Sequence, residues 1–133
     1  MRSLTIPVLA MLLVASSCLT QSKRNKIFAE GVEDAFVESK MAEQYLAYVA
    51  ADASLSDSDK GKRTSWVARV KVLLDEHKAD VVSDIKFHML TNGICAQYDA
   101  YIDADPNLRD TSKEIRKRSS EQIRKLIKTA EGS

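Results

Sequence analysis

The chain of 133 residues has few cysteines, glycines and prolines. It contains two Cys, four Gly and two Pro. Two cysteines cannot form the set of disulfides that stabilises many small exported domains. Few turn-forming residues, and no stretch of strictly alternating apolar and polar residues, argue against a β-sheet protein. Stability must therefore come from a helical hydrophobic core, and a chain of this length can bury one.

An excess of charge of one sign is also absent, as is a long apolar run. The chain has 20 Lys and Arg against 19 Asp and Glu, a formal net charge of +1. Proteins that bind nucleic acids usually carry a basic excess, so we expect no nucleic-acid partner. The most apolar stretch, Leu4 to Val14, is shorter than the roughly 20 residues that a membrane-spanning helix needs.

The N-terminus has the features of a secretory signal peptide. Arg2 supplies a positive charge, residues 4–14 form a short apolar core, and residues 15–17 are Ala, Ser and Ser. Small residues before the cut suit signal peptidase. We therefore predict that residues 1–17 are removed and that the mature chain begins at Cys18. Because the signal holds one charged residue, Arg2, the mature chain keeps 19 basic and 19 acidic residues.

The segment Ala15-Ser16-Ser17-Cys18 resembles the lipobox of bacterial lipoproteins, although those proteins usually have Leu where Ala15 stands. The resemblance ends at Cys18. It implies that Cys18 receives a diacylglycerol on its sulfur and an acyl chain on its freed amino group, which would anchor the chain to a membrane of the cell envelope. Two alternatives stay open: cleavage with secretion or release into the periplasm, and retention of the apolar segment as a signal anchor.

Residues 18–26 are predicted to carry the lipid and to form a short polar tether. Lys23, Arg24 and Lys26 would lie near anionic lipid, where each basic residue contributes about 1 kcal/mol to membrane binding. The alternative interpretation is a soluble linker that happens to be basic.

From residue 27 onward, apolar residues recur at intervals of three and four, which predicts amphipathic helices. Three apolar stripes consist of Phe28, Val32, Phe36, Ala42, Leu46 and Val49; of Trp66, Val70, Leu73, His77, Val81, Ile85 and His88; and of Ile115, Ile123, Leu126, Ile127 and Ala130. The first stripe predicts one helix over about residues 26–52.

Two segments of the chain match without a gap. Residues 97–130 align with residues 44–77 at an offset of 53, the difference between Gln97 and Gln44. Identical residues stand at positions 44, 45, 47, 48, 51, 52, 55, 57, 60, 63 and 73 of the first segment and at the corresponding positions of the second. Chance rarely produces such a run, so we interpret it as an internal repeat with copies at residues 27–77 and 80–130.

Each copy is predicted to be a helical hairpin, with its loop at residues 52–57 or 105–110. Pro106 excludes a helix interior at the second loop. Ser56 or Asp57 and Asp110 or Thr111 are candidate N-caps of the following helices.

Two such hairpins are expected to pack together as an all-α four-helix bundle, because one hairpin cannot bury its apolar stripe. No Gly or Pro separates residues 76–80, so the second and third helices could be fused, and the alternative architecture is an extended rod. The first helix is acidic and the last is basic, and this opposition predicts that the two are neighbours.

Several side chains could form a partner surface. The four tyrosines lie in pairs near the ends of the predicted helices, and the last helix is basic. The candidate residues are Tyr45, Tyr48, Tyr98, Tyr101, Arg116, Arg124 and Lys128. The competing interpretation gives the tyrosines a packing role, with each hydroxyl bonded to the adjoining loop, and treats the charges as a solvated face.

No catalytic or metal-binding constellation stands out. His77 and His88 lie on an apolar stripe without the Glu-x-x-His pairs of bundle metal sites, and Cys95 aligns with Ala42 on an apolar face. We interpret all three as structural residues and expect no cofactor.

The sequence therefore predicts a non-enzymatic envelope lipoprotein that binds another envelope protein or a cell-wall polymer. One alternative is a phage- or prophage-encoded accessory lipoprotein that modulates lysis or superinfection, because the loop pattern Tyr-x-x-x-Asp-x-x-Leu-Ser-Asp at residues 48–57 resembles small helical proteins of phage genomes. The other alternative is a bundle that binds a metal or a small ligand.

Overall fold

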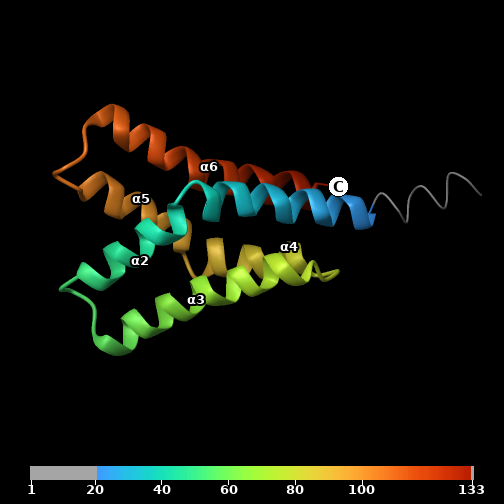
Figure 1. Ribbon diagram of the computed structural model, residues 1–133, viewed down its shortest axis with the longest axis horizontal. Coiled ribbons are helices and arrows are strands. Elements are labelled where there is room, and N and C mark those ends of the chain that lie inside the picture. Colours follow the sequence, from blue (N-terminus) through green and yellow to red (C-terminus); the bar gives the residue numbers. More distant parts are fainter. Residues whose placement is uncertain (1–20, 133) are drawn as a thin grey trace, which may run out of the picture.

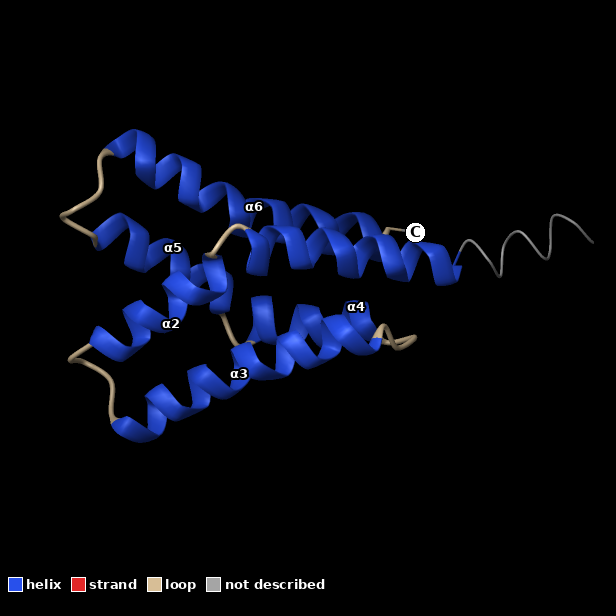
Figure 2. Ribbon diagram, in the orientation of Figure 1, coloured by secondary structure: helices blue, strands red, loops and turns tan. Residues whose placement is uncertain are grey.

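The computed structural model of the chain describes residues 21–132, and the predicted signal peptide and Cys18 lie outside them. The described part is an all-α bundle without strands, as predicted (Figure 2). Residues 21–33 are helical and continue into the π-helix η1 (Asp34–Glu38); we call residues 21–38 the first helix. The following elements are α2 (Met41–Ala51), α3 (Asp57–Glu76), α4 (Val81–Lys86), the π-helix η2 (Phe87–Thr91), α5 (Ile94–Ala104) and α6 (Asp110–Glu131).

The predicted continuous helix over residues 26–52 is wrong, because the chain breaks between η1 and α2. Ser39 N–H donates to the carbonyl of Asp34 at 3.1 Å, five residues back, and Lys40 takes a left-handed conformation with φ 73°. The two repeat copies, residues 27–77 and 80–130, are called the first and second halves below. The second half breaks in the same way as the first. Asn92 N–H donates to the carbonyl of Phe87 at 2.8 Å, and Gly93 has φ 90°. A π-turn adds one residue to the helical turn and shifts the direction in which the next helix leaves.

These breaks allow the two halves of the chain to cross in the middle of the bundle. The first helix lies beside α6, whereas α2 packs against α3 (Figure 1). In the second half, α4 lies beside α3, whereas α5 packs against α6. The long helices α3 and α6 thus form opposite edges, and each half of the chain contributes to both sides of the bundle.

Elements of the two halves correspond at the offset of 53 residues. Helix α5 begins and ends 53 residues after α2, η2 does so relative to η1, and α6 begins 53 residues after α3. Loops occupy residues 52–56 and 105–109, close to the predicted ranges. Ser56 is the N-cap of α3 and accepts from Asp59 N–H at 3.1 Å, whereas α6 has Arg109 at this position, without a side-chain cap.

A fusion of the second and third helices does not occur. Helix α3 ends at Glu76, His77 takes a left-handed conformation with φ 51°, and α4 begins at Val81. The chain therefore turns back on itself, and α3 and α4 are in contact. The bundle is compact, and the extended rod is wrong.

The predicted tether is also wrong for residues 21–26, which are helical. Asn25 is buried and accepts from Gln21 Nε2 at 3.2 Å, while Lys26 pairs with Glu30 one turn later at 4.0 Å. These i, i+4 contacts extend the first helix towards Cys18.

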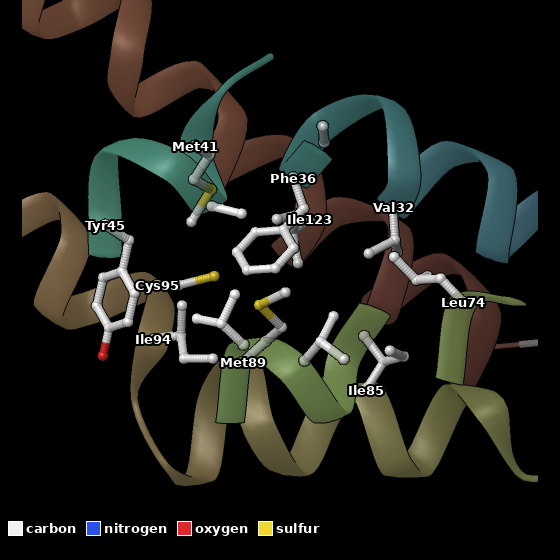
Figure 3. Close-up of a cluster of buried hydrophobic side chains, with 14 of the residues drawn as sticks. Val32, Phe36, Met41, Tyr45, Leu74, Ile85, Met89, Ile94, Cys95 and Ile123 are labelled. Carbon is white, nitrogen blue, oxygen red and sulfur yellow. The ribbon is translucent and has the colours of Figure 1, made fainter. Parts of the chain in front are cut away.

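The core runs through the crossing of the two halves. Figure 3 shows Phe36 and Met41, which flank the first break, close to Met89 and Cys95, which flank the second. All four side chains are buried, together with Phe28, Val32, Tyr45, Val49, Val67, Val70, Leu73, Leu74, Val81, Ile85, Ile94, Tyr98, Ile102, Ile123 and Ile127. The predicted stripes supply about half of the buried core, and the buried residues of α5 lie on no predicted stripe. Among the stripe residues, Ile115 and His77 are exposed and His88 is only half-buried.

The predicted contact between the first helix and α6 is present, but apolar packing makes it. A β-carbon at position 31 would lie 3.0 Å from both δ-carbons of Leu126, so Gly31 allows the two helices to approach closely. Within residues 21–132, no ion pair joins the two helices. Instead, Lys117 pairs with Asp103 at 2.7 Å and Arg124 with Asp99 at 2.9 Å, which ties α6 to α5.

Candidate functional site

The four tyrosines gather where α2 meets α5. Tyr48 and Tyr101 stack with ring centroids 5.3 Å apart and ring planes 10° apart, and Tyr45 meets the edge of Tyr101 at 6.3 Å. Tyr45 and Tyr98 are fully buried, while Tyr48 and Tyr101 are half-buried. The two predicted aromatic patches are therefore one cluster, made by both halves of the chain.

The buried tyrosines bond across the cluster in a reciprocal manner. Tyr45 Oη donates to Gln97 Oε1 at 2.5 Å, and Tyr98 Oη donates to Gln44 Oε1 at 2.5 Å. Each tyrosine thus binds the glutamine that directly precedes its counterpart in the other half. Both buried hydroxyls are satisfied, which removes the desolvation cost that an unpaired hydroxyl would carry.

The outer tyrosines repeat this exchange with charged partners. Tyr48 Oη donates to Asp105 Oδ2 at 2.6 Å and accepts from Arg116 Nη1 at 3.3 Å. Correspondingly, Tyr101 Oη donates to Asp52 Oδ2 at 2.6 Å and accepts from Arg63 Nη1 at 3.1 Å. The packing interpretation bonded each hydroxyl to the adjoining loop, but the two outer hydroxyls reach the loop of the opposite half, and the two buried ones reach glutamines of α5 and α2.

In Asp52 and Asp105, each of the two carboxylate oxygens accepts a different hydrogen bond. Oδ1 accepts from a backbone N–H two residues later, from Ser54 or Asn107 at 2.9 Å, and so shapes its own loop. Oδ2 accepts the tyrosine hydroxyl of the other half. Hydrogen bonds from Ser54 and Tyr101 lower the pKa of Asp52 to about 2, and those from Tyr48 and Asn107 lower the pKa of Asp105. Both carboxylates are therefore ionised at neutral pH.

Lysines complete the correspondence between the halves. Lys60 Nζ donates to the carbonyl of Ala50 at 2.9 Å, and Lys113 Nζ donates to the carbonyl of Asp103 at 2.9 Å. Both bonds join the helix before a loop to the helix after it. Six of the eleven positions that are identical between the halves, 44, 45, 48, 52, 60 and 63 in the first, form this network of hydrogen bonds.

The predicted partner surface is only partly available. Tyr45 and Tyr98 are buried, and Arg116 and Arg124 are occupied by Tyr48 and Asp99. Lys128 is exposed. Most of the basic charge on α6 therefore serves contacts within the bundle, and Tyr48, Tyr101 and Lys128 are the predicted members that still reach the surface.

A second polar cluster occurs in one half only and was missed by sequence reasoning. Ser120 is buried, and its hydroxyl donates to Asp99 Oδ1 at 2.5 Å; Arg124 pairs with the other oxygen of Asp99. The equivalent positions in the first half are Leu46 and Val67. The signal that could have identified the cluster is this departure from the repeat, a polar pair in place of an apolar pair.

Cys95 lies beside this cluster but is not suited to chemistry. Its thiol is fully buried, 4.0 Å from the carbonyl oxygen of Ser120. Burial raises the pKa of the Cys95 thiol to about 12. A thiol that stays protonated is a poor nucleophile and metal ligand, so the structural interpretation of Cys95 agrees with its setting.

The two histidines are far from equivalent. His77 is exposed at the end of α3, which corrects its placement on an apolar stripe. His88 is half-buried, contacts Asn92 Nδ2 through Nδ1 at 3.2 Å and meets Phe87 edge to face. Burial and the charge of Arg69 lower the pKa of His88, so the imidazole is neutral at pH 7.

Within the described residues, no group of three or more His, Cys, Asp or Glu side chains is placed to hold a metal ion. Over the same range, no helix is both long enough and apolar enough to cross a bilayer. Comparisons with models of protein families, with curated proteins and with solved structures found no match to this chain.

The crossed hydrogen bonds predict an energetic coupling between the halves. Replacing Tyr48 by Phe removes a hydroxyl that donates to Asp105, and Tyr101→Phe removes the equivalent one. We expect each to lower the free energy of unfolding by about 1.5 kcal/mol, the low end of the range for a hydrogen bond to a charged group, because both sites are only half-buried. In a double-mutant cycle measured by urea denaturation, Tyr48→Phe should couple more strongly to Asp105→Asn than to Asp52→Asn. Equal coupling to both aspartates would contradict the crossed pairing.

The tyrosine cluster also predicts the behaviour of the protein at high pH. Burial raises the pKa of Tyr45, Tyr98 and Tyr101 to about 12, against an ordinary value of 10. Because the folded state favours the neutral hydroxyls, their contribution to stability is complete below pH 10 and is lost as the pH rises through about 12. We expect tyrosinate absorbance to develop together with the loss of helical circular dichroism. Ionisation of all four tyrosines near pH 10 in a protein that stays fully helical would refute this.

Proposed function

We propose that this chain is an exported lipoprotein, anchored by lipid on Cys18, whose helical bundle acts by binding another envelope protein or the cell wall and catalyses no reaction. The observation that carries the proposal is the signal-like segment that ends in Ala15-Ser16-Ser17-Cys18, with a helix already formed at Gln21. An anchor at Cys18 would lie three residues from a folded body.

The use of the reactive side chains supports a binding role. The tyrosine hydroxyls bond to Gln and Asp of the opposite half, and the thiol of Cys95 is buried. These tyrosine hydroxyls are thus engaged in contacts within the bundle. A body held in this way suits a protein that presents a fixed surface to a partner.

Exposed residues on two elements suit such partners. Phe87 and Leu90 on η2 are 51% and 38% exposed. Exposed apolar side chains of this kind favour a protein partner. Arg118 and Lys128 on α6 are exposed and would favour an anionic polymer of the cell wall.

The anchor is tested by Cys18→Ser. We expect the wild-type protein in the membrane fraction with the mass of the lipid on its first residue, and the Cys18→Ser protein either in the soluble fraction or as an unprocessed precursor. The control is Cys95→Ala, which removes the other cysteine and introduces the residue found at the equivalent position 42. This variant should stay in the membrane fraction. A wild-type protein that is soluble and carries no lipid would contradict the proposal.

A further inference from the structure

A groove lies at the end of the bundle where the described chain begins. It runs between the first helix and α6, has a volume of about 460 Å³ and starts at Gln21. Its apolar lining comes from Ile27 and Phe28 of the first helix, Val82 of α4, and Leu126 and Ala130 of α6. Ile27 is 56% exposed there, so the groove leaves apolar surface in contact with water, which is unfavourable.

The corresponding place in the other half of the bundle packs more tightly. At the offset of 53 residues, Leu126 corresponds to Leu73. Leu73 is buried, whereas Leu126 is only partly so. The difference arises because the turn at residues 77–80 joins α3 directly to α4, while no turn joins α6 to the first helix.

A lipid carried by the segment before the first helix, residues 18–20, could cover the apolar lining of the groove. In a chain processed before Cys18, only Cys18, Leu19 and Thr20 precede Gln21. Three extended residues reach about 10 Å, so a lipid on Cys18 would start within reach of the groove. Arg24 and Lys125 also line it, and no Asp or Glu does. Their aliphatic stems can extend the apolar lining while the charges stay at the level of the lipid headgroups.

We propose that one acyl chain carried by Cys18 folds back into this groove and covers Ile27, Val82, Leu126 and Ala130. The inference rests on the proposed lipidation. The lipobox resemblance implies three acyl chains on Cys18, two on the diacylglycerol and one on the amino group. The two that remain are enough for stable anchoring, which takes two chains or an equivalent pair of signals. The groove end of the bundle then lies against the bilayer, and the loops at residues 52–56 and 105–109 point away from it.

Photocrosslinking in the lipidated full chain tests this docking. A diazirine-bearing amino acid replaces Val82, which lines the groove, or Val72, which is 43% exposed on α3 and does not line it. The processed protein, purified from membranes, is returned to vesicles of phosphatidylethanolamine and phosphatidylglycerol and irradiated. Mass spectrometry of the peptides should show a crosslink from position 82 to the lipid of Cys18 in the same chain, and none from position 72. Adding Ala130→Phe, which fills the groove, should reduce the crosslink several-fold while circular dichroism stays unchanged.

The outcomes separate the two proposals. A protein without lipid by intact mass contradicts the anchor and the docked chain together. A lipidated protein that crosslinks position 82 to vesicle phospholipid, to another protein or to nothing keeps the anchor and overturns the docking. Equal crosslinking from positions 72 and 82 also overturns it, because the acyl chain would then contact the bundle without preference.

Discussion

The bundle depends on the exchange of hydrogen bonds between two halves that cross each other. Each half supplies an aspartate at the end of one helix and a tyrosine that reaches the aspartate of the other half. Without these bonds, the carboxylates of Asp52 and Asp105 would still shape their loops, but α2 and α5 would lose the polar contacts that align them. Tyr48 and Tyr101 extend in opposite directions across the contact between α2 and α5 to reach these aspartates. Their rings therefore lie side by side and stack.

Crossing also explains why neither half forms a compact unit by itself. The first helix packs on α6 of the second half, and α4 packs on α3 of the first. The apolar residues at the breaks, Phe36, Met41 and Met89, face one another in the centre (Figure 3). A hairpin of one half alone would leave these side chains in water. The fold is thus closer to a pair of interlocked partners than to two hairpins placed side by side.

Much of this could be predicted from the sequence, because it depends on local pattern. Helical periodicity indicates the fold class and about half of the core, and Pro106 with the residues around it indicates the loops. The matching segments indicate several residues that form the hydrogen-bond network, including Tyr48 and Asp52. Which partner each one binds could not be predicted, since the bonds join residues that are brought together only by the crossing.

The crossing itself depends on features that have little local signal. Asn92-Gly93 is a recognisable helix end, but the equivalent Ser39-Lys40 is not, and Lys40 adopts a positive φ that favours glycine. The prediction of a polar tether at residues 21–26 was wrong for a similar reason. These residues are polar, and the burial of Asn25 depends on tertiary contacts that have no local signal. The role of the bundle as a body held near a membrane is a proposal that joins the N-terminal sequence to this architecture.

The most direct test of the interlocked halves is to cut the chain between them. A protease site inserted in the exposed turn at residues 77–80 of the full chain would allow cleavage after folding. Native mass spectrometry and gel filtration would then report whether the fragments separate. The crossed arrangement predicts that the two fragments stay together as one helical complex until a denaturant is added. Fragments that separate at once and each remain helical would contradict it.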